Sequence, residues 1–481
     1  MKISFLLLAT AATGFAAWPS VGPNYQRPDA SSPSAFHDAG DGGDWKTAEP
    51  ADDFARGEWW KLFEDPALNE LEAAALSANQ DIRAAASRVE QARAAAGVAR
   101  GSYWPQVAAD GSLVREQTSR TTDNVLPQSR TTTYAAPLTA AWEIDLFGRV
   151  RRLSESARAD AEGSAADFEN VRLALTTEVA TTYFTLRAFD RELEILRETV
   201  GVRRRALDLI NARVSGGAAA DLDTARAETE LATAEAEVAA LANRRAAARH
   251  ALAVLVGQPA PEFELPVRAA AFSNLPSVPA GLPAQLLERR PDIAAAERAL
   301  AAANARIGVA KAAFFPAISL TGSAGFASGD IDRLSDSDSR LWSIGPRLYL
   351  PIFQGGRNRA NLERSRAAYE ESVAQYRQQV LVAFREVQDA LTATRLLAEQ
   401  AVAQDRALAS AKRAAALAQT RYDAGFVSYL EVIDAQRTAL ATERASTQLA
   451  AQRFNTSVAL IKALGGGWQA PAAGGARVAA N

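Results

Sequence analysis

Alternating apolar and polar residues mark four segments of the chain, at 107–113, 138–146, 318–326 and 342–352. Successive side chains of a β-strand point to opposite faces, so this period of two predicts strands. The segments form two strand pairs, within 104–147 and 315–352. The alternation in each pair is typical of barrel strands, which have one face toward lipid and one face toward water. It is equally typical of strands in a soluble sheet that is half-buried on a core. Four strands cannot close a barrel, so membrane strands would require several copies of the chain.

The second pattern is two very long helical regions that contain no proline. None occurs between Pro137 and Pro259 or between Pro351 and Pro471, and Ala, Arg, Glu, Gln and Leu dominate both intervals. Glycines near 217 and 425 interrupt each region once, which predicts helical hairpins at 148–257 and 356–464. The first hairpin has unequal arms of about 65 and 36 residues, and the longer one spans roughly 100 Å. Shorter helices are expected at 66–102 and 283–312.

The order of these elements repeats along the chain. Residues 81–105 match residues 292–316 at a constant offset of 211, and positions from Arg149 to Gly257 match positions from Arg357 to Gly465 at an offset of 208. We therefore expect two equivalent halves, 66–265 and 283–465, joined by a linker at 266–282. An N-terminal extended segment at 18–65 and a C-terminal tail at 466–481 complete the organisation.

Composition excludes several classes of function. The formal net charge is -3, so the chain lacks the basic footprint of a nucleic-acid binder. Cysteine is absent and the two histidines, His37 and His250, lie far apart in the sequence, which leaves no zinc cluster or thiolate nucleophile. We expect no cofactor, no metal, no catalytic residue and no enzyme activity.

The first residues predict export. Lys2 precedes an apolar run at 3–9, and the small residues Gly14, Ala16 and Ala17 follow, which is the pattern of a signal peptide at 1–17. No apolar run of about 18 residues occurs later, so an inner-membrane helical protein is not expected.

Several distinctive segments follow one another along the chain. They are VGPNYQRP at 21–28, WWKLFEDPAL at 59–68, DLFGR at 145–149, PIFQGGR at 351–357 and RYDAG at 421–425 followed by SYLEVIDA at 428–435. These segments resemble the outer-membrane factors of tripartite efflux pumps, of TolC, OprM and NodT type. The resemblance covers about 20–465 in order and spacing.

The resemblance implies a mainly α-helical protein with a small transmembrane β portion. It implies a homotrimer in the outer membrane, with a 12-stranded β-barrel built from four strands per chain above a helical barrel in the periplasm. The expected function is a passive exit channel for drugs or other small toxic compounds. Its expected partners are a periplasmic membrane-fusion adaptor, an inner-membrane transporter of RND type and outer-membrane lipid. The family's OprM branch carries a lipidated cysteine near the mature N-terminus, and this chain, with none, is not expected to carry that anchor.

Two other functions are compatible with the residue patterns. One is an exit duct for proteins in type I secretion, and the other is an exported coiled-coil scaffold that forms no channel.

The resemblance also indicates candidate site residues. Glu431 and Asp434 lie three apart, on one face of a helix, and with Tyr422 they are candidates for a periplasmic gate and selectivity filter. A solvated helix face is the alternative reading. Candidates for adaptor docking lie at the hairpin tips, and candidates for membrane-interface aromatics lie on the strands. The docking residues are Gly217, Leu222, Gly425, Ser428 and Leu430, and the aromatics are Trp142, Phe147, Trp342 and Tyr349.

Overall fold

The computed structural model describes residues 20–28, 36, 57–119, 121, 130–268, 272, 275–276 and 290–467. The predicted signal peptide, most of the predicted linker and nearly all of the C-terminal tail lie outside these residues. The chain divides into two compact units. Unit 1 comprises 1–29, 88–165 and 295–377, and unit 2 comprises 30–87, 166–294 and 378–481.

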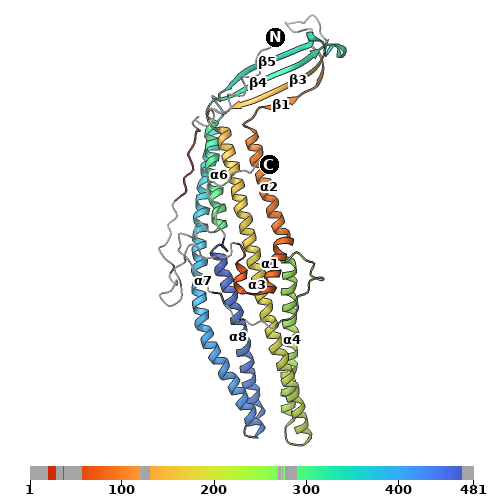
Figure 1. The fold of residues 1–481 in the computed structure, drawn as a ribbon, viewed down its shortest axis with the longest axis vertical. Helices are drawn as coiled ribbons and strands as arrows, with labels where there is room; N and C mark the ends of the chain where they lie inside the picture. The colour runs from red at the N-terminus through yellow and green to blue at the C-terminus, as the bar shows by residue number, and fades with distance from the viewer. Residues whose placement is uncertain are drawn as a thin grey trace. The chain divides into compact units, whose positions relative to one another are not determined.

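One antiparallel sheet dominates unit 1 (Figure 1). Its strands are β1 (Gln106–Ala109), β2 (Ser112–Gln117), β3 (Arg130–Ile144), β4 (Ala317–Ser328) and β5 (Arg340–Tyr349). β1 and β2 both pair with β3, and the order continues to β4 and then β5. Two short 3-10 helices, η5 (Ile331–Arg333) and η6 (Ser337–Ser339), lie between β4 and β5. The strand pairs predicted from the alternation are therefore present.

The first predicted strand is split into β1 and β2 between Ala109 and Ser112. Pro137 on β3 lies beside the break and has no N–H to donate, while its carbonyl accepts from the Asp110 N–H at 2.9 Å. On its other side Pro137 pairs with Gly325, where an added Cβ would lie only 2.5 Å from the Pro137 Cα. The proline thus explains both the interrupted ladder and the glycine beside it.

The N-terminal residues 20–28 pack on the helices of unit 1. These helices include the first part of α3 (Arg149–Ser215) and most of α6 (Pro291–Ala312). Arg152 donates to the Asn24 side chain at 2.7 Å, and the Asn304 amide donates to the Pro23 carbonyl at 3.1 Å. A Cβ at Gly22 would lie 2.5 Å from the Gly308 Cα, so this close approach requires glycine.

Unit 2 consists mainly of two helical hairpins. The first joins the distal part of α3 to α4 (Asp221–Leu255), and the second joins the distal part of α7 (Arg357–Asp423) to α8 (Tyr429–Ala463) (Figure 1). α3 and α7 each have 67 residues, and α4 and α8 each have 35. The prediction of long, unequal hairpin arms is confirmed. Within the described ranges, no helix combines the length and the apolar character that crossing a membrane requires.

The helix predicted at 66–102 is interrupted at Asn79. The structure has α1 (Pro66–Ala78) and α2 (Gln80–Gly101) instead. The Asn79 side chain accepts from the N–H groups of Asp81 and Ile82 and donates to the Leu255 carbonyl at 2.9 Å. It therefore starts a new helix and ties it to the end of α4. The helix predicted at 283–312 is described from Pro291 onward as α6.

An aromatic cluster anchors the segment before α1 on unit 2. The 3-10 helix η4 (Trp59–Phe63) buries its aromatic side chains, and Phe63 lies 5.0 Å from Phe184 and 5.9 Å from Phe454, between ring centroids. Phe184 comes from α3 and Phe454 from α8. The cluster therefore links the two hairpins away from their tips.

Candidate functional site at the hairpin tips

Both hairpins of unit 2 turn in the same way. At the first tip the Gly217 N–H donates to the Val214 carbonyl at 2.9 Å and the Ala218 N–H to the Arg213 carbonyl at 2.8 Å. The second tip repeats this pattern at Gly425 and Phe426. The two glycines have φ values of +73° and +79°, as the Schellman helix ending requires. The predicted tip glycines thus have a clear conformational role.

The tips expose apolar side chains. Leu222, which follows the first turn, and Leu430, which follows the second, are both exposed. Ser428 is the exposed N-cap residue of α8, and its hydroxyl accepts no capping hydrogen bond. Phe426 is 78% exposed, and the sequence reasoning missed it. No local sequence signal marks this residue, because the residue after a Schellman glycine usually packs on its own helix, and only the structure shows that this ring does not.

Glu431 and Asp434 lie on the exposed face of the first turns of α8. The opposite face carries Val432 and Ile433, which are buried in a cluster with Ile210 of α3. Within the described part of the chain, the Glu431 carboxylate has no hydrogen-bonding or ion-pair partner. The structure therefore presents both carboxylates together, as the three-residue spacing predicts.

Tyr422 has a different environment from these carboxylates. Its ring lies 5.6 Å from that of Tyr429, and the Arg213 guanidinium of α3 sits over it at 4.8 Å from the centroid. It is half-buried against the same apolar cluster. Tyr422 therefore joins the two hairpins through its cation–π contact with Arg213.

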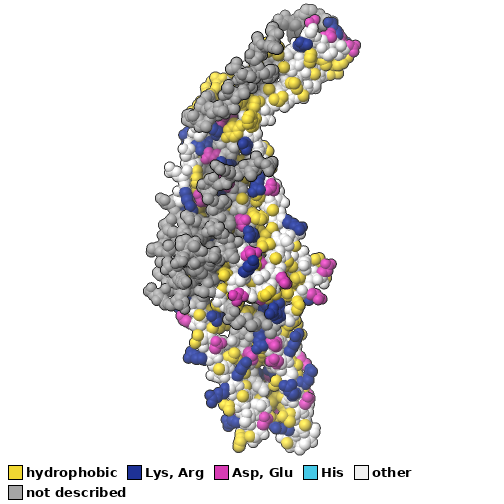
Figure 2. All heavy atoms as spheres, in the orientation of Figure 1, with side chains coloured by type: hydrophobic (Ala, Val, Ile, Leu, Met, Phe, Trp, Pro, Cys, Tyr) yellow, Lys and Arg dark blue, Asp and Glu magenta, His cyan; other side chains and the backbone are white. Residues whose placement is uncertain are grey.

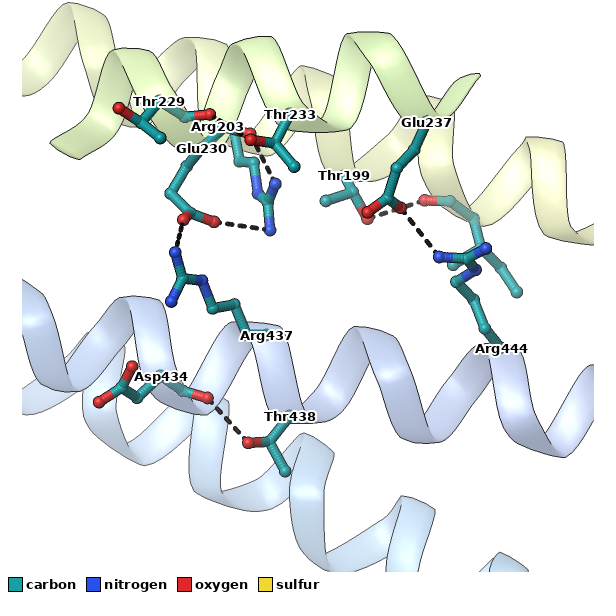
Figure 3. A network of polar contacts seen from close by, with 11 residues as sticks. Thr199, Arg203, Thr229, Glu230, Thr233, Glu237, Asp434, Arg437, Thr438 and Arg444 are labelled. Carbon is teal, nitrogen blue, oxygen red and sulfur yellow. Dashed lines mark hydrogen bonds and ion pairs between the residues drawn. The ribbon is translucent and has the colours of Figure 1, made fainter. Parts of the chain in front are cut away.

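A ladder of charged residues links the hairpins above the tips, and Figure 3 shows it. In the first rung Glu230 of α4 accepts from Arg203 of α3 at 2.9 Å and from Arg437 of α8. Arg203 also donates to the Glu230 backbone carbonyl at 2.6 Å. Glu230 and Arg203 are both buried, so removing either side chain would leave the other charge unpaired and would lower the stability of the fold.

The second rung lies seven residues further along both helices. Arg444 of α8 donates to Glu237 of α4 at 2.8 Å and to the buried Glu192 of α3 at 3.3 Å. Both α4–α8 rungs join residues that are 207 positions apart. Seven-residue spacing on two parallel helices keeps side chains on one seam, so the ladder holds a fixed register. The sequence reasoning missed it, although the spacing of Glu230 and Glu237 matches that of Arg437 and Arg444.

The predicted interface aromatics lie in unit 1 in two kinds of environment. Trp342 and Tyr349 on β5 are exposed, and Trp142 on β3 donates from its indole N–H to the Tyr103 carbonyl at 2.9 Å. Phe147 follows the end of β3 and stacks on Phe315 at 4.8 Å, so it packs at the strand-to-helix joint. Figure 2 shows hydrophobic side chains along the sheet, whereas basic and acidic side chains intermingle along the hairpins.

Comparisons with known proteins agree with this fold. The family model of the outer membrane efflux protein matches residues 71–258 and 282–466. The solvent efflux pump outer membrane protein SrpC of Pseudomonas putida is 39% identical over 453 residues, which cover 93% of this chain and 95% of that protein. The cation efflux system protein CusC of Escherichia coli is 35% identical over 472 residues, covering 97% and 99%.

Solved structures of outer-membrane channels are also similar to this chain. The outer-membrane channel OprN superposes with a TM-score of 0.83 at 35% identity, covering 93% of this chain and 99% of that chain. The Campylobacter jejuni CmeC outer membrane channel gives a TM-score of 0.85 at 27% identity, covering 94% and 95%. The names of these relatives and solved structures describe efflux or an outer-membrane channel. The chain therefore belongs to the outer membrane efflux protein family and acts as the outer-membrane channel of an efflux pump.

Proposed function

We propose that three copies of the chain form the working channel, and that the four strand positions of each copy contribute to one 12-stranded β-barrel. The observation that carries this proposal is the sheet of unit 1. Its two outer positions, β1 with β2 on one side and β5 on the other, have no further strand partner among the described residues. Open edges of this kind are stable in a membrane only when they pair with other strands.

One face of the sheet has the apolar character that lipid requires. Trp342 and Ile344 on β5 are 78% and 69% exposed, and Leu138 on β3 and Val107 on β1 are also exposed. The register aligns Val107, Ala140, Gly322 and Ile344 in one row across the sheet. The opposite face carries hydroxyls, including Ser323 and Ser343, which lie 2.9 Å apart. This division supports a wall with lipid outside and water inside.

An apolar stripe on α7 supports association of the hairpins as well. Leu381, Leu396, Val402 and Leu417 are exposed. At about 100° per residue these positions fall within an arc of roughly 120° on one side of the helix. In a trimer this stripe would pack against a neighbouring copy. The equal lengths of α3 and α7, and of α4 and α8, support the two-fold repeat that such a tunnel uses.

In this assembly the hairpins lie in the periplasm and their tips meet a membrane-fusion adaptor. Leu222, Phe426 and Leu430 offer apolar contacts there, and Ser428 offers a free hydroxyl. An inner-membrane transporter of RND type supplies the energy, so the channel itself conducts passively. Glu431 and Asp434 repeat around the threefold axis and form an acidic ring that controls the periplasmic end.

We extend this proposal to the cargo as small toxic compounds, including organic solvents and drugs. Relatives over most of the chain are named for solvent efflux, toluene efflux and cation efflux. Such variety among similar channels fits an exit duct whose cargo is chosen by its transporter.

A cross-linking experiment tests the trimer. The chain contains no cysteine, so Val107→Cys on β1 and Ile344→Cys on β5 would be the only thiols in a double variant. In membranes, a short bismaleimide should link neighbouring copies through these edges and produce covalent dimers and trimers on a denaturing gel. Each single variant provides the control, because it carries a thiol on only one edge of the sheet. It therefore cannot link that edge to the opposite edge of a neighbouring copy. A double variant that stays monomeric under the same labelling would contradict the proposed barrel.

A further inference from the structure

A surface cavity of about 480 Å³, open to solvent, lies in unit 2 between α3, α4 and α8. Its floor is formed by the buried side chains of Ala188, Leu241 and Ala451, together with the half-buried ring of Phe189. Arg244 and Gln452 lie at its exposed rim. The volume and the mixture of an apolar floor with a few polar groups are those of small-molecule sites.

The cavity lies where the charged ladder lacks its next rung. The rungs at Glu230 and Glu237 of α4 each meet an arginine of α8 in the same register. Seven residues further along α4 stands Arg244, and the register partner on α8 is Ala451. A methyl group replaces the expected charged side chain, which leaves both an empty volume and an arginine without its counterpart.

One buried polar atom of the lining lacks a partner, and one exposed charge has no ion pair. Within the described residues, no carboxylate or carbonyl accepts from the Arg244 guanidinium. The Asn455 Oδ1 atom is buried without a donor, while its amide nitrogen donates to Thr185 at 3.3 Å. The Oδ1 atom has almost no accessible surface, so the exposed Arg244 guanidinium is the group of these two that an occupant of the cavity can reach.

The charges of the lining select the kind of occupant. Glu192 also lines the cavity, but Arg444 and Gln448 donate to its carboxylate at 3.3 and 3.2 Å. Arg244 is therefore the uncompensated charge. A guanidinium matches a carboxylate through two parallel hydrogen bonds, and the apolar floor suits a ring or a short alkyl chain.

We propose that this cavity binds a small amphipathic carboxylate. The carboxylate pairs with Arg244, and the apolar body lies on Leu241 and Phe189. The site concerns binding by each chain, so it depends neither on the trimer nor on the identity of the cargo.

Fluorescent 2-naphthoate is a suitable probe, with neutral 2-naphthamide as its uncharged match. Equilibrium dialysis against the full-length protein held in amphipol should show saturable binding of one naphthoate per chain. Arg244→Gln removes the charge at an exposed position and should weaken binding about tenfold, the usual loss for a charged hydrogen bond. Arg205→Gln, an exposed arginine of α3 outside the cavity, should leave binding unchanged.

A second variant separates loss of the site from loss of the fold. Ala451→Glu supplies the missing rung, so its carboxylate should pair with Arg244 and fill the cavity. Naphthoate binding should then disappear while the midpoint of thermal unfolding stays the same or rises. Equal binding of naphthoate and naphthamide, unchanged binding to both cavity variants, or no saturable binding to the wild-type protein would each overturn the proposal.

Discussion

At the scale of single residues, Glu230 is a side chain that joins the two hairpins through ion pairs. Its carboxylate is buried and pairs with the buried Arg203 and with Arg437. A buried ion pair adds little net stability, but removing one partner leaves the other charge uncompensated in a poorly solvated place. The effect of a substitution should therefore be far larger than a surface ion pair would give.

We expect Glu230→Gln to destabilise the hairpin pair by about 3 kcal/mol, because Arg203 keeps its charge and loses its carboxylate. The matched control is Glu235→Gln, which breaks an exposed pair with Arg204 at 2.6 Å and should cost about 1 kcal/mol or less. Thermal unfolding followed by helical circular dichroism measures both variants. Equal midpoints for the two would show that the Glu230 network is dispensable.

Glu72 on α1 gives a prediction about pH. Its side chain is fully buried, neither carboxyl oxygen has a hydrogen-bonding partner, and burial raises the pKa of this carboxyl to about 9 from its ordinary value of 4.5. Between these two values the unfolded chain is ionised at Glu72 while the folded protein keeps the carboxyl neutral. Stability is therefore lost as pH rises through this window.

Glu72→Gln removes the proton binding that causes this loss. We expect the variant to match the wild-type protein near pH 4 and to be more stable near pH 8, by an amount of the order of several kcal/mol. Thermal midpoints at the two pH values give the comparison, with Glu70→Gln on the exposed side of α1 as the control. A stability difference for Glu72→Gln that is the same at both pH values would argue against a buried neutral carboxyl.

At the scale of elements, the long hairpins were the easiest feature to predict. Absence of proline and a single glycine turn are local signals, and the Schellman endings at Gly217 and Gly425 depend on nothing else. The break at Asn79 was not predictable in this way. Its amide donates to Leu255, 176 residues further along the chain, so the capping arrangement depends on tertiary packing.

The same distinction between local signals and tertiary contacts explains which parts of the candidate site the sequence predicts. The spacing between Glu431 and Asp434 is local and predicts their shared face. The ladder instead needs α4 and α8 to lie side by side in one register, and no pattern within either helix states that Glu230 meets Arg437. Phe426 was overlooked because an aromatic residue after a turn normally packs inward, and only the structure exposes it.

The ladder should control how firmly α8 is held to the first hairpin. Arg437 and Arg444 both donate to α4, to Glu230 and Glu237. In the double variant Arg437→Glu/Arg444→Glu, like charges would face each other along the seam and push the two hairpins apart. We expect a higher resting conductance in planar bilayers.

The charge-restoring variant provides the control for this prediction. Adding Glu237→Arg to the double variant again places opposite charges across the second rung, because the new arginine faces the glutamate introduced at position 444. This triple variant should lower the conductance part of the way. An unchanged current in the double variant would separate the ladder from the opening of the channel.

At the scale of the whole molecule, the exposed tips should determine whether the channel joins its pump. Phe426→Asp replaces an exposed ring at the second tip with a charge, and little packing would be lost because the ring is 78% exposed. We expect trimers to form normally, drug or solvent tolerance to be lost in cells that depend on this channel, and adaptor cross-linking to decrease. Phe426→Leu keeps an apolar side chain and should preserve tolerance. Full tolerance with Phe426→Asp would exclude this tip from docking.

The acidic ring that we propose for Glu431 and Asp434 is the feature that depends most on assembly. In one chain Glu431 and Asp434 are solvated carboxylates, and Asp434 is three residues from Arg437, whose guanidinium is already bound to Glu230. Around a threefold axis the same residues would bring six carboxylates together, and this negative potential would attract cations and repel anions.

Glu431→Gln/Asp434→Asn removes the charge and keeps the shape of both side chains. In planar bilayers we expect the reversal potential in a salt gradient to shift toward lower cation selectivity, with the trimer intact. Glu228→Gln, at an exposed position of α4, is the control for a general change of surface charge. If the double variant and the control show the same reversal potential as the wild-type channel, these carboxylates do not line the conducting path.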